Sequence, residues 1–135
     1  MTQIRISQAA ALLGVSDDSV RRWVADGRLT ATPDAVGRQV LDGAELARFA
    51  EALHADDAIA GLDSGIGARS ARNHFTGIVT RLLSDTVMSQ VELQCGPNRV
   101  TSLISTEAVR ELGLEVGSIA TAVVKATNVT LEVAR

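Results

Sequence analysis

Apolar residues in the first half of the chain recur at the spacing of short amphipathic helices. A helix over residues 8–14 is expected to begin after Ser7, and a second over residues 17–26 to begin after Ser16. The positions at core spacing in these two helices are Ala10, Leu13, Val20, Trp23 and Val24. Two short helices joined by a Gly-Val turn outline a helix-turn-helix.

A hairpin and a third helix are expected to follow. Two apolar stretches, residues 29–32 and 39–41, flank a turn-rich run over residues 33–37. Asp42 can cap a helix over residues 43–53. The buried stripe of that helix comprises Leu46, Phe49 and Leu53. Helix, turn, helix, wing and helix in this order predict a winged helix-turn-helix domain.

The second half alternates apolar and polar residues as β-strands do. Strands are expected over residues 75–83, 87–95, 99–104, 118–125 and 129–133. Between the third and fourth strands, Ser105 or Thr106 can cap a short helix over residues 107–113. Five short strands with one helix at this place describe an OB-like β-barrel, so the predicted fold class is α+β.

The stretch between the two halves has its own composition. Residues 55–69 include Gly61, Gly65 and Gly67 and show no sustained periodicity, which favours a flexible tether. The sequence therefore predicts three parts. They are a winged helix-turn-helix domain over residues 1–54, a linker over residues 55–69 and a β-domain over residues 70–135.

Composition limits the function classes. Hydrophobic residues make up 46% and charged residues 21%, a globular balance, while aromatics at 2% disfavour base stacking. The single Cys95 excludes an internal disulfide, and lone His74 is expected to be structural or at the surface rather than a metal ligand. No secretory leader or membrane span is found, so the cytoplasm is expected. No nucleophile–base pair, metal cluster or phosphate loop is found, so we expect no enzyme.

Charge by itself does not suggest nucleic acid. The net charge is −3. Residues 1–54 hold arginines at Arg5, Arg21, Arg22, Arg28, Arg38 and Arg48 against acids at Asp17, Asp18, Asp26, Asp34, Asp42, Glu45 and Glu51. Such a chain can still bind DNA if it dimerises and gathers its arginines on one face.

The start of the second half gathers hydrogen-bond donors. Ser70-Ala71-Arg72-Asn73 offers a hydroxyl, a guanidinium and an amide, and Ser105 and Lys125 add two donors further along. No acidic residue adjoins this segment in the sequence. Donors without acceptors suit a fully deprotonated oxyanion.

The first half resembles a known family. The resemblance lies in Ile6-Ser7-Gln8-Ala9-Ala10-Ala11-Leu12-Leu13-Gly14-Val15-Ser16, Ser19-Val20-Arg21-Arg22-Trp23 and Gly27-Arg28-Leu29, which are similar to the MerR/excisionase winged helix-turn-helix family. It implies that the second helix lies in the major groove of double-stranded DNA, with Ser19, Arg21 and Arg22 in contact, and that Arg38 of the wing contacts the backbone. Arginine suits both phosphate and guanine. The alternative is that Arg21 and Arg22 form a solvated helix face. Trp23 is expected in the core.

The second half resembles another family. The matching segments are Ser70-Ala71-Arg72-Asn73, Gly77-Ile78-Val79, Glu107-Ala108-Val109, Leu112-Gly113-Leu114, Gly117 and Val124-Lys125-Ala126-Thr127, which are similar to the Mop (molbindin) domain of the TOBE group. This resemblance implies molybdate or tungstate bound between subunits. The implied oxyanion-binding residues are Ser70, Ala71, Arg72, Ser105, Lys125, Ala126 and Thr127. Residues 74–76 depart from the Gln-Leu-Lys common in that family.

One copy of such a domain has to oligomerise if the site lies between subunits, and a dimer and a hexamer both stay open. For Lys125 taken alone, an exposed strand-end lysine is the alternative. The two resemblances together imply a molybdate- or tungstate-responsive transcriptional regulator. The alternative is a molybdate storage or buffering protein that uses its helical domain for assembly or non-specific DNA binding.

Overall fold

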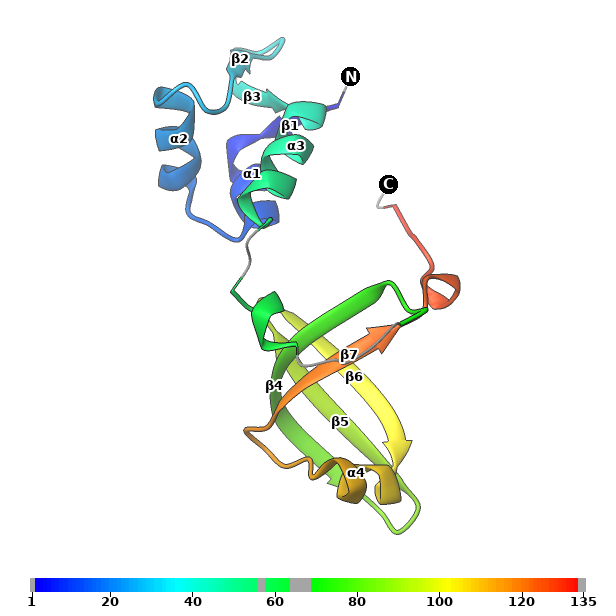
Figure 1. The fold of residues 1–135 in the computed structure, drawn as a ribbon. Helices are drawn as coiled ribbons and strands as arrows, with labels where there is room; N and C mark the ends of the chain where they lie inside the picture. The colour runs from blue at the N-terminus through cyan, green and yellow to red at the C-terminus, as the bar shows by residue number, and fades with distance from the viewer. Residues whose placement is uncertain (1, 56–57, 64–68, 134–135) are drawn as a thin grey trace. The chain divides into compact units, whose positions relative to one another are not determined.

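The computed structural model describes residues 2–55, 58–63 and 69–133, and the chain divides into two compact units, Met1–Asp56 and Asp57–Arg135 (Figure 1). The elements of the first unit are β1 (Gln3–Arg5), α1 (Ile6–Leu13), α2 (Asp17–Ala25), β2 (Ala31–Pro33), β3 (Gln39–Asp42) and α3 (Gly43–Leu53). Its three short strands form an antiparallel sheet in the order β1-β3-β2. The winged helix-turn-helix expected from the sequence is confirmed.

The caps of α2 and α3 explain where these helices begin. The Ser16 hydroxyl accepts the backbone N–H of Ser19 at 3.2 Å, and a carboxylate oxygen of Asp42 accepts that of Glu45 at 3.4 Å. The expected cap at Ser7 is wrong, because α1 begins two residues earlier with Arg5 at its N-cap. The Gln8 side chain accepts the backbone N–H of Arg5 there, so a residue of the first turn supplies the cap.

The helices of the first unit enclose an aliphatic core with one aromatic pair at its border. The fully buried members of this core are Ala9, Ala10, Leu13, Val20, Leu29, Leu41 and Leu46. Trp23 packs against it and contacts Phe49 with ring centroids 5.0 Å apart and the rings tilted by 54°, so its expected core position is confirmed. The guanidinium group of Arg28, for which the sequence predicted no contact, lies over both rings, at 5.9 Å from the Trp23 centroid and 5.3 Å from the Phe49 centroid.

The second unit is a curled antiparallel sheet with the strand order β6-β5-β4-β7. Its elements are η1 (Ala60–Leu62), β4 (Asn73–Ser84), β5 (Met88–Cys95), β6 (Asn98–Ser105), α4 (Thr106–Leu112), β7 (Ile119–Val124) and η2 (Ala126–Asn128). On β5, Ser89, Val91, Leu93 and Cys95 are buried while the residues between them are more exposed, which confirms the alternation seen in the sequence. The expected α+β class is confirmed, and the second unit is a curled antiparallel half-barrel with one short helix.

β4 belongs to both halves of this sheet. Its first part, from Asn73 to Ile78, pairs with β7, and its second part, from Ile78 to Ser84, pairs with β5. The two pairings overlap at Ile78. The residue before it, Gly77, approaches β5 so closely that a Cβ there would lie 2.7 Å from the Cys95 sulfur and still closer to the Gln94 carbonyl oxygen. Glycine at this point lets the sheet curl.

The expected fifth strand over residues 129–133 is wrong for the chain by itself. Residues 129–133 pair with no strand of the described chain, and the last strand, β7, ends at Val124 and leads into the η2 turn. Leu131 and Val133 are 91% and 84% exposed. A strand needs the backbone of a neighbour, and no other strand lies beside this segment within the described chain.

The expected linker is partly ordered. Residues 60–62 form the η1 turn, which contacts β4, and Asp63 forms an ion pair with Arg69. Gly61 lies in this turn, while Gly65 and Gly67 lie outside the described residues. Among the described residues, no helix is long and apolar enough to cross a membrane.

Candidate oxyanion and DNA sites

Two of the three expected oxyanion-binding segments lie side by side. Asn73 pairs with Val124 in the β4–β7 ladder, and its side-chain amide also donates to the Val124 carbonyl at 3.1 Å. This contact places Ser70–Arg72, just before β4, next to Lys125–Thr127, just after β7. The sequence places the Asn73 amide among the donors expected for an oxyanion, whereas in the structure this amide donates to Val124 and links the two segments.

The charges of this cluster are positive and uncompensated. Arg72 and Lys125 are exposed, and neither has an acidic group within ion-pair distance among the residues that the structure describes. Ala71 is buried at 8% exposure, so the loop between Ser70 and Arg72 is fixed by its middle residue. Lys125 stands at the N-cap of η2, directly after β7.

Ser105 does not join this cluster within one chain. It ends β6, where it pairs with Met88 at the start of β5, and the start of β5 in turn pairs with the far end of β4. Ser105 and Ser70–Arg72 therefore lie at opposite ends of the twelve-residue strand β4 (Figure 1). The Ser105 hydroxyl oxygen accepts the Ala108 backbone N–H at 3.0 Å as the cap of α4, which leaves the hydroxyl hydrogen available for donation.

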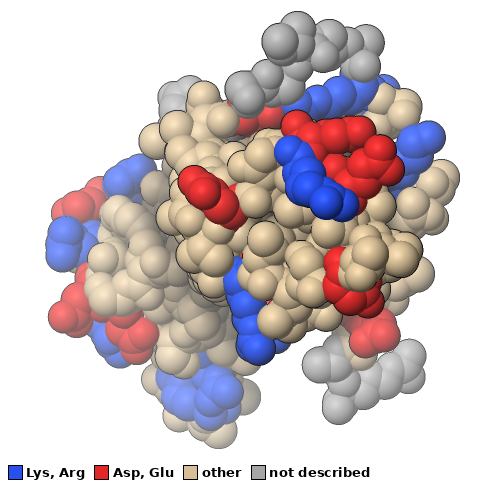
Figure 2. Space-filling view, turned by 90° about the horizontal axis from the view of Figure 1, so that it is seen from below, with Lys and Arg blue, Asp and Glu red and all other residues tan. Residues whose placement is uncertain are grey.

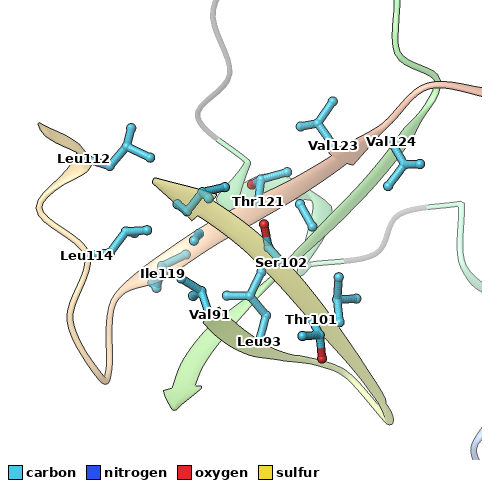
Figure 3. A pocket seen from close by; sticks show the side chains of 14 residues that line it. Val91, Leu93, Thr101, Ser102, Leu112, Leu114, Ile119, Thr121, Val123 and Val124 are labelled. Atoms are coloured by element: carbon cyan, nitrogen blue, oxygen red, sulfur yellow. The ribbon is translucent and has the colours of Figure 1, made fainter. Parts of the chain in front are cut away.

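The hollow on the concave side of the sheet has a different chemistry. It measures about 440 Å³ and lies between the two edge strands, β6 and β7 (Figure 3). Its walls are aliphatic or hydroxyl side chains, among them Leu93, Ile104 and Ile119, and none of them is charged. Such a surface suits an apolar segment rather than a dianion.

The residues expected to contact DNA differ in whether their side chains already have a hydrogen-bond partner within the chain. Arg21 and Arg22 are exposed on α2, and Val20 between the helices is fully buried, so the arginine-bearing side of α2 faces solvent. The Ser19 hydroxyl lies 3.1 Å from that of Ser16, within the cap of the same helix. The apolar stripe of α2 thus orients the candidate contacts outward.

Arg38 of the wing is held by an acid. Its Nε donates to Asp34 at 3.2 Å, and the second carboxylate oxygen of Asp34 accepts the backbone N–H groups of Val36 and Arg38. Hydrogen bonds from the Arg38 and Val36 backbone lower the pKa of Asp34, although partial desolvation opposes them. The wing turn is therefore ordered by an acidic group, and Arg38 is already partnered.

No single-sign surface stands out on the face seen in Figure 2, where acidic and basic residues are interspersed. Among the described residues, no group of three or more His, Cys, Asp or Glu side chains could hold a metal ion. Burial raises the pKa of the Cys95 thiol, which also donates to the Phe75 carbonyl.

Comparisons with known proteins identify both halves of the chain. Residues 4–54 match the helix-turn-helix domain family, and residues 69–131 match the TOBE domain family. "Molybdenum-pterin-binding protein 2" of Clostridium pasteurianum is 44% identical over 63 residues, which are 46% of this chain and 93% of that protein.

Two solved structures resemble the second unit. MopII from Clostridium pasteurianum is 42% identical over 49% of this chain and 100% of its own, with a TM-score of 0.46. A molybdate binding protein from Sporomusa ovata is 27% identical over 49% of this chain and 98% of its own, with a TM-score of 0.48.

Proposed function

Because this chain belongs to the TOBE-domain family of the molybdenum-pterin-binding proteins, we propose that it is a cytoplasmic, molybdate- or tungstate-responsive transcriptional regulator. The oxyanion binds between the C-terminal units of an oligomer, and the N-terminal helix-turn-helix domain binds double-stranded DNA. The observation that supports the proposal is the pairing of Asn73 with Val124, which places the segment Ser70–Arg72 next to the segment Lys125–Thr127.

The chemistry of this cluster favours a tetrahedral dianion. Molybdate carries no proton near neutral pH, so its oxygens accept hydrogen bonds and donate none. Two cations, a serine hydroxyl and backbone N–H groups satisfy such an ion. Hydrogen phosphate would leave its own proton without an acceptor, at a cost of about 1–3 kcal/mol. Sulfate has the same charge and no proton, so only its smaller size distinguishes it.

A site that also contains Ser105 needs two chains. Ser105 stands at the opposite end of β4 from Ser70–Arg72, so the two groups of one chain do not share one small ion. A neighbouring subunit that presents its Ser105 hydroxyl to the Arg72–Lys125 cluster completes the set of donors. This arrangement supports a site between subunits.

The apolar surfaces of the second unit support an oligomer as well. Val129, Leu131 and Val133 alternate along an exposed segment that pairs with no strand of the described chain. The hollow between β6 and β7 offers an uncharged surface and two strand edges. We propose that this segment of one subunit occupies that hollow in its partner, which adds the missing fifth strand.

Anion binding then acts on DNA through the arrangement of the subunits. Ser19, Arg21 and Arg22 contact DNA from α2 and Arg38 from the wing. An anion that stabilises one subunit arrangement changes the spacing of the two DNA-binding domains, and with it the affinity for an operator. A coupling of about 1–3 kcal/mol, or about 5–150-fold, is typical of such regulators.

A storage or buffering protein is the second candidate, and the wing favours it. Arg38 is already paired with Asp34, and residues 1–54 hold no excess of basic groups. A storage protein takes up anions with no change in DNA affinity and shows little sequence preference.

Two measurements on the full chain separate these functions. Calorimetric titration with molybdate, tungstate and sulfate gives the number of sites per chain and the selectivity. Selection of duplexes from randomised DNA, with and without molybdate, then shows whether binding is specific and anion-dependent. Tight molybdate binding with an unchanged DNA affinity contradicts the regulator and supports storage, and absence of molybdate and tungstate binding contradicts both.

A further inference from the structure

The carboxylate of Asp63 contacts the two residues that flank the anion-binding segment Ser70–Asn73, Arg69 on one side and His74 on the other. Both terminal nitrogens of the Arg69 guanidinium group donate to it, Nη1 to Oδ2 at 3.0 Å and Nη2 to Oδ1 at 2.9 Å. His74 approaches the same group, with its Nδ1 3.8 Å from Oδ2. Arg69 directly precedes Ser70, and His74 directly follows Asn73, so one carboxylate gathers the two ends of Ser70–Asn73.

The His74 ring also reaches into the middle of this segment. Its Nε2 lies 2.9 Å from the Ala71 carbonyl oxygen, and because a carbonyl only accepts, Nε2 carries a proton. His74 is itself part of β4, so its ring links the Ala71 backbone to the strand that follows the anion-binding segment. On its other side the ring places Nδ1 at 3.8 Å from the Asp63 carboxylate, so it stands between the Ala71 backbone and the linker acid.

These contacts lie in a partly buried place. The side chains of Arg69 and Asp63 are 24% and 18% exposed, so their ion pair is screened less than one at the surface. The bidentate hydrogen bond with Asp63 raises the pKa of Arg69. The η1 turn just before Asp63 contacts β4, so the carboxylate itself stands on an ordered element.

A bare carboxylate close to a dianion would oppose binding. Here the bidentate pair with Arg69 neutralises the Asp63 carboxylate. Asp63 therefore affects the anion site by fixing the positions of its neighbours and adds no net negative charge beside the anion. The Ser70 hydroxyl and the Arg72 guanidinium do not contact Asp63 and stay exposed. They lie on a loop whose conformation is held at Arg69, Ala71 and His74.

We infer that Asp63 is a positioning residue of the oxyanion site: it fixes the Ser70–Arg72 loop in its binding conformation through Arg69 and His74, and so fastens the linker to the anion-binding segment. This inference rests on the proposed function. It assigns a role to a residue that precedes the TOBE match and to a histidine that departs from the family's usual residue at that place.

Replacement of Asp63 by Asn in the full chain tests the inference. Calorimetry with sodium molybdate is expected to show an affinity about tenfold lower, because the loop then has to be ordered on binding. Glu115→Gln is the matched control. Glu115 is exposed in the loop after α4, and its replacement removes the same charge from the same unit. It should leave affinity within about twofold of wild type.

A second test compares two replacements of His74, one that keeps an N–H donor and one that removes it. His74→Gln keeps an N–H that can reach the Ala71 carbonyl and should bind molybdate nearly as wild type does, whereas His74→Ala should lose about tenfold. Equal affinities for these two variants, or an Asp63→Asn affinity equal to or above wild type, overturn the positioning role.

Failure of the proposed function is separately visible. A wild-type chain that binds neither molybdate nor tungstate contradicts the anion site itself. The positioning role is then measured without any anion, through the amide resonances of Ser70, Ala71 and Arg72. Asp63→Asn should move these three resonances and leave those of β5 in place, and unchanged loop resonances overturn the inference.

Discussion

The side-chain amide of Asn73 donates to the main-chain carbonyl of Val124 at 3.1 Å, in addition to the ladder pairing of the same two residues. This contact aligns the segment before β4 with the segment after β7. Everything proposed for the oxyanion site depends on that alignment, because Arg72 and Lys125 come from residues that lie far apart in the sequence.

Asn73→Asp should therefore damage the site from within. A carboxylate cannot donate to the Val124 carbonyl and adds a negative charge beside the anion, so molybdate affinity should fall by about 5–150-fold, the equivalent of about 1–3 kcal/mol for a polar group left without its partner. Titration calorimetry measures this loss. Asn98→Asp, at the exposed start of β6, carries the same charge change and should bind as wild type does. Equal losses in both variants would show a general charge effect instead.

Arg72→Ala should remove anion binding and leave the fold intact. Arg72 is exposed and has no ion-pair partner among the described residues, so its side chain contributes little to the folded state. A charged hydrogen bond to the ligand is worth about 1.5–3 kcal/mol, which predicts a loss of at least about tenfold in affinity. Arg99→Ala, at an exposed position on β6, is the control. Retained affinity with an unchanged unfolding midpoint contradicts the assignment of Arg72.

The sequence predicted the local structure well where a residue's own backbone and side chain decide it. Ser16 and Asp42 begin helices because their side chains accept an N–H three residues on. Gly14 and Gly113 end helices with φ of 69° and 65°, in the left-handed region that glycine adopts without strain. These features need no knowledge of distant parts of the chain.

Features that depend on distant partners were not predictable in this way. The alternation of Val129, Leu131 and Val133 is typical of a strand, yet a strand forms only beside another backbone, and the described chain supplies none. The separation of Ser105 from Arg72 follows from strand pairing rather than spacing. The Asp63–Arg69 pair depends on how the linker folds back, and its sequence suggested only a tether.

Gly77→Ala should destabilise the second unit. A methyl group at this position meets the Gln94 carbonyl and the Cys95 sulfur across the β4–β5 pairing, and a backbone atom cannot move aside cheaply. Overpacking of this kind costs about 1–3 kcal/mol of unfolding free energy, measured by urea denaturation. Gly61→Ala is the matched change, because a Cβ there has no neighbour within 4 Å. A Gly77→Ala chain as stable as Gly61→Ala contradicts the close approach.

Asp34→Asn should strengthen non-specific DNA binding. The change removes an acid from the wing and releases Arg38 from its ion pair, so one more arginine can neutralise a phosphate. The plot of log affinity against log salt should become steeper by about 1. Glu51→Gln, an equal charge change at an exposed position of α3, should leave the slope unchanged. An unchanged slope in Asp34→Asn means that the wing does not contact the DNA backbone.

Leu131→Glu should separate the oligomer and remove anion binding together. If residues 129–133 add a strand in the apolar hollow of a partner, Val129, Leu131 and Val133 face inward, because alternate residues of a strand share a face. A carboxylate at the middle position would then be buried without a partner, which costs several kcal/mol. Thr130→Glu places the same charge on the opposite face and should assemble normally. Sedimentation of both variants with and without molybdate measures the outcome. Intact assembly of Leu131→Glu contradicts strand addition, and a monomer that still binds molybdate tightly contradicts a site shared between subunits.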